Sequence, residues 1–190
     1  MRAFVSTVAV LLLVSGAALV GYARWTRPLG DADAALADGR LYEATAGYQI
    51  AEARFDALPA AKQIVPVEYS RAVGNHLLAL YWLKRYEEVI DLAQKAPAAA
   101  SPNFWSACAF FQKATVEAAP EARLGWLSRA EEEFRKAIEA APDDWDTKYD
   151  FELTTRLASE LRKQPNTPPK QLMQLLRPPT AGAKPARRTG

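Results

Sequence analysis

The segment of residues 130–144, AEEEFRKAIEAAPDD, holds an amphipathic helical pattern with a defined end. Ala130, Phe134 and Ala137 recur at spacings of four and three, so they lie along one stripe of an α-helix while charged residues occupy the other faces. Pro142 ends the helix, because proline has no backbone N–H and disfavours helical geometry in the residue before it. The segment predicts a helix that buries one face against neighbouring helices.

The same spacing of apolar residues recurs between prolines along the chain. No run alternates with a period of two and no Asn-Gly hairpin signal occurs, so strands are not expected. The sequence therefore predicts an all-α domain, with a connector bracketed by Pro59 and Pro66. The expected helices cover residues 32–38, 41–55, 67–83, 85–96, 103–118, 120–141 and 146–163, the last with Tyr149, Leu153, Leu157 and Leu161 along its apolar side.

Residues 4–23, FVSTVAVLLLVSGAALVGYA, contain no charged residue. A helix of about 20 such residues is long enough to cross the ~30 Å hydrocarbon core of a membrane. Arg2 precedes the run and Arg24 follows it, and Tyr22 and Trp25 stand where an interfacial aromatic belt would lie. Residues 1–24 are therefore predicted to form a transmembrane anchor.

A cleaved signal peptide is the alternative for residues 1–24, since Gly21, Tyr22 and Ala23 roughly fit the small-x-small rule, although the run exceeds the usual signal core of about 7–15 residues. A two-residue N-terminus before such a run usually stays inside. We therefore expect a single-pass protein of the bacterial cytoplasmic (inner) membrane, with residues 25–30 as a linker and the helical domain in the periplasm.

Charge is distributed unevenly along the chain. All 22 acidic residues lie between Arg24 and Lys163, whereas residues 164–190 contain basic residues and no acidic one. The helical region has no basic face, so nucleic acid is not expected as a partner. Six prolines also lie between residues 164 and 190. This composition predicts a disordered, basic tail.

The residues that most active sites require are scarce. His76 is the only histidine and Cys108 the only cysteine, which excludes the usual zinc sites and nucleophilic triads. His76 and Cys108 are both expected inside the core. The acidic cluster of residues 143–150 lacks the glycine and terminal glutamate of an EF-hand, and Asp144 or Asp146 suits a helix cap. We expect no catalytic residue, no metal site and no cofactor.

The pattern of residues 130–144 resembles the second half of a tetratricopeptide (TPR) repeat, a helical pair of about 34 residues. In such repeats, small residues occupy the crossing of the two helices, apolar residues contact the next pair, and a proline ends the second helix. The resemblance implies a TPR-like solenoid of about seven helices over residues 31–163, which binds other proteins. Three units fit the layout, with Ala32, Ala35, Leu41, Ala44 and Tyr48 in the first, Leu77, Leu80, Tyr86, Val89 and Ala93 in the second, and Ala130, Phe134, Ala137 and Pro142 in the third.

A narrower resemblance rests on the single N-terminal span, the divergent repeats and the segment WDTKYDFEL at residues 145–153. This layout is similar to that of small membrane-anchored repeat proteins encoded beside von Willebrand-type and MoxR-type ATPase proteins, among them the MxaK family of methanol-oxidation gene clusters. That family is implicated in maturation of periplasmic methanol dehydrogenase, including supply of its calcium. The resemblance implies an accessory factor for a periplasmic enzyme.

A protein partner is expected in the concave groove that the first helix of each repeat lines. In the second unit, Arg71 and Asn75 lie one turn apart, a spacing suited to gripping a peptide carboxylate or backbone. Tyr81 and Trp82 offer aromatic anchors, or else pack against the neighbouring helical pair. The predicted partner-binding residues are Arg71, Asn75, Leu78, Tyr81 and Trp82.

Together these patterns predict a membrane-anchored adaptor that is not an enzyme and binds no small molecule. The alternative is a structural subunit packed permanently into a membrane complex. An exposed aromatic patch at Phe104, Trp105, Phe110 and Phe111 would favour this alternative, and burial of the four rings would oppose it.

Overall fold

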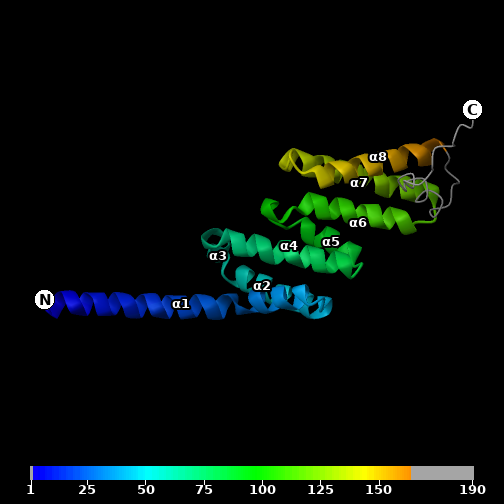
Figure 1. Ribbon diagram of the computed structural model, residues 1–190. Helices are drawn as coiled ribbons and strands as arrows, with labels where there is room; N and C mark the ends of the chain where they lie inside the picture. The colour runs from blue at the N-terminus through cyan, green and yellow to red at the C-terminus, as the bar shows by residue number, and fades with distance from the viewer. Residues whose placement is uncertain (1, 164–190) are drawn as a thin grey trace, which may run out of the picture. The chain divides into compact units, whose positions relative to one another are not determined.

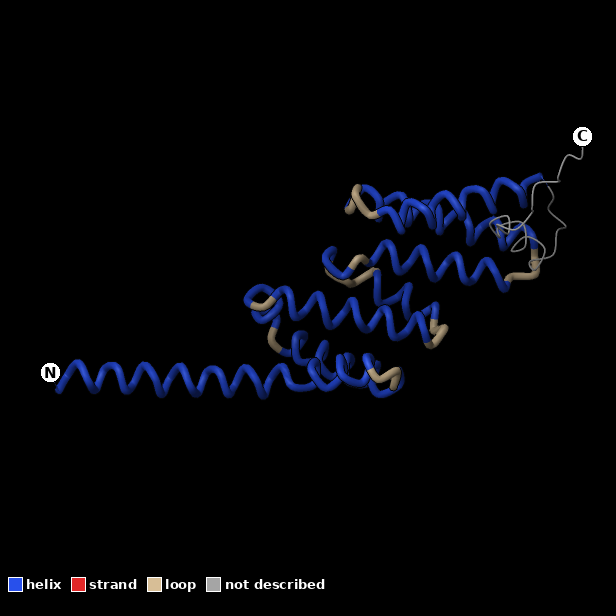
Figure 2. The backbone as a smooth tube through the Cα atoms, in the orientation of Figure 1, coloured by secondary structure: helices blue, strands red, loops and turns tan. Residues whose placement is uncertain are grey.

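Residues 2–163 form eight α-helices and one short 3-10 helix in a computed structural model, with no strand in this range (Figures 1 and 2). The all-α, helical-repeat-like fold is confirmed. The predicted tail, residues 164–190, lies outside the described residues. The helices are α1 (Arg2–Ala37), α2 (Leu41–Ala57), α3 (Pro59–Ile64), α4 (Pro66–Trp82), α5 (Tyr86–Ala93), η1 (Ala98–Ala100), α6 (Pro102–Val116), α7 (Pro120–Ala140) and α8 (Trp145–Lys163).

The chain divides into two compact units where one helical domain was expected. Unit 1 is Met1–Trp105 and unit 2 is Ser106–Gly190. In unit 1, α2 packs against both α1 and α4. Its core contains Ala32 and Ala44, the small residues predicted at the helix crossing. A Cβ added at Gly47 would stand 2.7 Å from the Cβ of Ala32, so only glycine allows this close approach of α1 and α2.

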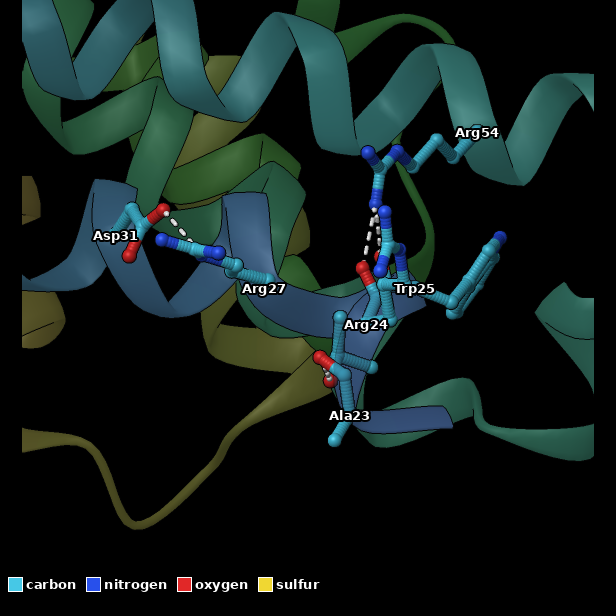
Figure 3. Close-up of polar contacts among 7 residues, drawn as sticks. Ala23, Arg24, Trp25, Arg27, Asp31 and Arg54 are labelled. Atoms are coloured by element: carbon cyan, nitrogen blue, oxygen red, sulfur yellow. Dashed lines mark hydrogen bonds and ion pairs between the residues drawn. The ribbon is translucent and has the colours of Figure 1, made fainter. Parts of the chain in front are cut away.

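α1 is a single helix that continues through residues 25–30, which we expected to be a separate linker. Pro28 lies inside it and has no N–H for the carbonyl of Arg24, four residues earlier. Figure 3 shows the side chain of Arg54 reaching from α2 to this carbonyl. The Arg54 Nη1 donates to the oxygens of Arg24 and Trp25 at 3.1 and 2.5 Å. A donor from another helix therefore satisfies the carbonyl that Pro28 leaves free.

The stretch Ala9–Ala37 of α1 is long and apolar enough to cross a membrane, and its most apolar window is not buried by any other element. The exposed side chains in it include Leu12 and Leu13, at 68% and 73%. A signal sequence near the N-terminus would meet the same criteria of length and composition. The structure thus bears out one candidate membrane-spanning helix.

The α1–α2 turn is closed by a Schellman motif around Gly39. Gly39 has a φ of 73°, in the left-handed region that glycine adopts without steric cost. The N–H of Arg40 donates to the carbonyl of Ala35 at 2.8 Å, and that of Gly39 to Leu36 at 3.0 Å. These two bonds satisfy carbonyls that a helix end would otherwise leave unpaired.

The α4–α5 turn repeats the same geometry 45 residues later along the chain, with Lys84 at the glycine position. Lys84 has a φ of 60°. The N–H of Arg85 donates to Leu80 at 3.0 Å, and that of Lys84 to Tyr81 at 2.9 Å. Both turns therefore end a helix in the same way. The interval of 45 residues between them is longer than a 34-residue repeat, and α3 lies within it.

Lys84→Gly is expected to stabilise the protein by about 0.5–1 kcal/mol. A left-handed conformation costs a non-glycine residue roughly 1–2 kcal/mol, and the greater freedom of glycine in the unfolded chain offsets part of the gain. Gly39→Ala is the matched control and should destabilise by about 1 kcal/mol. Urea unfolding of the full chain in mild detergent, followed by circular dichroism, measures both. A destabilising Lys84→Gly would contradict the left-handed turn.

The predicted connector between Pro59 and Pro66 is largely helical, which corrects its assignment. Pro59 and Pro66 each stand in the first turn of a helix, α3 and α4, where the missing N–H costs nothing and the fixed φ suits the helix. Ala61 of α3 is buried in the core of unit 1. The two prolines therefore start helices here, in addition to ending the preceding ones.

In unit 2, α7 packs along α8, and the end of α6 joins their core. Ala130, Phe134 and Ala137, the stripe predicted from sequence, are all buried. The core cluster shared by the three helices consists of Ala114, Leu127, Leu157, Ala158 and Leu161.

The apolar side predicted for α8 was partly wrong, because Tyr149 is 62% exposed whereas Thr147 and Thr154 are buried. Two local hydrogen bonds satisfy the hydroxyl groups of these buried threonines. The Thr147 hydroxyl donates to the Asp144 carboxylate and the Thr154 hydroxyl to the Asp150 carbonyl, both at 2.7 Å. The buried stripe therefore starts from Thr147 rather than from Tyr149.

Asp144 caps α8, as the sequence suggested. Its carboxylate accepts the backbone N–H of Asp146 at 3.1 Å and that of Thr147 at 3.2 Å, besides the Thr147 hydroxyl. These bonds, the one from the hydroxyl foremost, lower the pKa of the Asp144 carboxyl. This acidic residue thus has a structural role at the start of α8.

Candidate functional site

The candidate site is an open pocket of about 660 Å³ in unit 1. One side is α4, and the opposite side is η1 with the residues that follow it. Most of its lining is apolar, with a few polar side chains among the apolar ones, a combination typical of binding pockets. The lining residues are Pro66, Val67, Ser70, Arg71, Gly74, Asn75, Leu78, Ala99, Ala100, Ser101 and Trp105.

The structure brings three of the five predicted binding residues together in this pocket. Arg71, Asn75 and Leu78 line it along α4. Tyr81 does not line it and is half-buried. Trp82 does not line it either and is 52% exposed. The pocket thus contains the first three of the predicted residues and neither of the two aromatic ones.

Tyr81 contributes to packing, the alternative that the sequence left open. Its ring lies 5.8 Å from the ring of Tyr86 and 5.8 Å from that of Trp105, between centroids. Trp105 in turn lines the pocket. Tyr81 therefore packs against a residue of the pocket lining without lining the pocket itself.

Asp33 of α1 organises the polar end of the pocket. Its Oδ1 accepts bonds from the Tyr48 hydroxyl at 2.8 Å and the Asn75 amide at 2.9 Å. Its Oδ2 lies 3.4 Å from the Nε of Arg71. Burial, together with the bond to Asp33, raises the pKa of Tyr48, which therefore remains a hydrogen-bond donor at neutral pH. The side chains of Arg71 and Asn75 thus both contact the carboxylate of Asp33, which belongs to the same chain.

The ion pair with Asp33 leaves part of the Arg71 side chain accessible to solvent. The Arg71 side chain is 51% exposed and faces the pocket, and only its Nε is paired with Asp33. Among the described side chains, the ion pair of Arg71 is the one between its Nε and the Asp33 carboxylate. A guanidinium held on one edge is positioned to bind an incoming carboxylate with its other edge.

Sequence reasoning missed Asp33 and Trp105. Asp33 stands at position 9 of the first repeat unit, the position that Leu78 occupies in the second, so applying the groove rule to both units would have found it. Trp105 comes from a different helix, and no spacing rule connects it to α4. Trp105 reaches the pocket because η1 packs against α4, which brings the residues that follow η1 close to α4.

Groups with catalytic potential lie in structural positions. His76 is buried, and its Nδ1 pairs with the Glu52 carboxylate at 2.8 Å. Its Nε2 finds no partner among the described residues, so only one ring nitrogen is satisfied. Burial raises the pKa of the Cys108 thiol to about 12, which leaves it unreactive. Within residues 2–163 no three His, Cys, Asp or Glu side chains gather as a metal site would require.

The four aromatic residues of α6 do not form an exposed patch. Phe104, Trp105, Phe110 and Phe111 are all half-buried. In unit 2, the ring of Phe110 stacks on Trp126 with centroids 5.9 Å apart.

Comparison with known proteins adds no identity, since no protein family, characterised protein or solved structure shows significant similarity to this chain. The TPR and MxaK resemblances therefore remain predictions from sequence.

Proposed function

We propose that this protein is a membrane-anchored helical adaptor that binds a carboxylate-bearing peptide segment of a protein partner in the α4 pocket. The accessible edge of Arg71 beside an apolar wall carries this proposal. A peptide carboxylate would pair with the guanidinium, while Leu78 and Trp105 would cover an adjacent apolar side chain. Anchoring by α1 would raise the local concentration of the adaptor near other membrane proteins.

Asp33 fixes the orientation of Arg71 in this scheme. Its carboxylate already holds the Nε edge of Arg71 and the amide of Asn75. The guanidinium is therefore pre-oriented, and less conformational freedom is lost when a ligand binds.

Arg71→Ala is expected to weaken binding of such a peptide by roughly 10–100-fold, because a hydrogen bond to a charged group contributes about 1.5–3 kcal/mol. The probe is a set of short fluorescent peptides that carry a terminal carboxylate or its amide beside an apolar residue. Anisotropy with the full-length protein in detergent measures the affinity. Wild type should prefer the carboxylate, and the preference should disappear in the variant.

Arg135→Ala is the matched control, since Arg135 is an exposed arginine of α7 that does not line the pocket. It should bind the peptides as wild type does. Equal affinity of wild type and Arg71→Ala for every carboxylate peptide would disprove the proposed site.

For the cellular setting we follow the predicted orientation and family resemblance. The adaptor would sit in the bacterial cytoplasmic membrane with its helical units in the periplasm, and would assist maturation of a periplasmic enzyme, methanol dehydrogenase in the case of an MxaK-like protein. The half-buried rings of α6 give no exposed aromatic patch to favour the alternative, a structural subunit packed permanently into a membrane complex.

A further inference from the structure

The apolar run of α1 ends level with one end of unit 1. Tyr22, the second-last residue of the run, donates its hydroxyl to the Glu68 carboxylate at 2.7 Å. Glu68 lies in the first turn of α4. In Figure 1, α3 and the start of α4 lie at the end of unit 1 from which the apolar half of α1 projects. A membrane that surrounds the run would therefore have its surface at this end.

The same end exposes three large apolar side chains on a short stretch of chain. Leu58 precedes α3, Ile64 ends it and Val67 lies in the first turn of α4. Their exposed fractions are 53%, 75% and 72%. We call these three residues the α3 corner. Three exposed apolar side chains this close together in the chain make the α3 corner a candidate interaction surface.

The position of the α3 corner relative to α1 is fixed by contacts that α2 makes with α1 just before Pro28. Arg54 holds the carbonyls of Arg24 and Trp25, as Figure 3 shows. The ring of Trp25 meets that of Phe55 edge-on, with centroids 4.8 Å apart. Because α1 continues into unit 1 without a flexible joint, the α3 corner keeps its level with respect to the apolar run.

We propose that the α3 corner inserts into the interfacial layer of the membrane that α1 spans, as a second lipid contact of unit 1. The proposal rests on the membrane anchoring in the proposed function. Apolar side chains at a membrane interface lie about 5–10 Å deep, at the boundary between headgroups and acyl chains. The apolar run ends near this boundary at Tyr22, and the α3 corner would lie at a similar depth. Arg27, exposed on α1 just beyond the run, would lie among the headgroups.

Membrane contact at the α3 corner also bears on the binding pocket. Val67 belongs to the corner and lines the pocket as well. One end of the pocket would thus open at the lipid surface, and a membrane-proximal segment of a partner would reach it most directly.

The test uses the full-length protein in vesicles of phosphatidylcholine with a minority of phosphatidylglycerol. Single cysteines are introduced by Ile64→Cys, Tyr42→Cys and Leu12→Cys in a Cys108→Ser background, and each carries an environment-sensitive fluorophore. Tyr42 is the matched control: it is exposed on α2 and lies about 24 Å along that helix from Leu58. Nitroxide lipids labelled in the headgroup or in the acyl chain quench the fluorophore according to its depth.

Headgroup nitroxides should quench the label at position 64 several-fold more than the label at position 42, and acyl-chain nitroxides should quench the label at position 12. Equal, weak quenching at positions 64 and 42 with strong quenching at 12 would overturn the α3 corner and leave the anchor standing. Weak quenching at position 12 would overturn the anchor, and the membrane contact of the corner with it.

Discussion

Deleting residues 2–23 is expected to move the protein from the membrane fraction to the soluble fraction. The run presents apolar side chains such as Leu11, Leu12 and Leu13 that no part of unit 1 covers. Each large apolar side chain contributes about 1.5–3 kcal/mol when it leaves water, so the run contributes on the order of 10 kcal/mol to membrane partitioning. Fractionation after alkaline carbonate extraction measures the change.

A double substitution, Leu12→Arg with Leu13→Arg, tests the same point without shortening the chain. An arginine at the centre of a membrane helix costs about 3 kcal/mol, so two should also release the protein or block its insertion. The control Leu12→Ala should stay in the membrane. The intact mass of the extracted wild type decides between the two readings of the run, because a cleaved signal peptide would leave a mature chain without residues 1–23.

Most of the helical architecture could be predicted from the sequence, because it depends on local patterns. Apolar spacing identified α2 and α4 to α8 to within a few residues, and the prolines located their ends. The continuity of α1 through Pro28 could not be predicted from local sequence. The carbonyl that Pro28 leaves unpaired accepts a hydrogen bond from Arg54, about 30 residues further along the chain. A proline next to a glycine-containing stretch normally suggests a break, and only a tertiary contact removes it here.

The candidate site could be predicted only in part, for a related reason. Arg71, Asn75 and Leu78 share one helix, so their common face follows from helical spacing. Asp33 comes from α1, and helical spacing within α4 does not reveal it. Arg71 and Asn75 both contact the Asp33 carboxylate, so they are less available to a ligand than the sequence suggested. A partner carboxylate would therefore meet one edge of Arg71, a narrower site than the sequence suggested.

Phe134→Ala is expected to destabilise the protein by about 3–5 kcal/mol, the range for removing a buried aromatic side chain. Phe134 is 1% exposed and lies on the buried stripe of α7. For a chain of this size the loss lowers the melting temperature by roughly 10 °C. Thermal unfolding of the full-length protein in mild detergent, followed by circular dichroism, measures the shift.

Tyr149→Ala is the matched aromatic control, and it also tests the corrected register of α8. Tyr149 is 62% exposed, so its truncation should change stability by no more than about 0.5 kcal/mol. Had Tyr149 formed part of the apolar side, as apolar spacing alone suggested, both truncations would cost several kcal/mol. A large loss for Tyr149→Ala would restore the register predicted from sequence, and a small loss for Phe134→Ala would mean that the stripe of α7 is not part of the core.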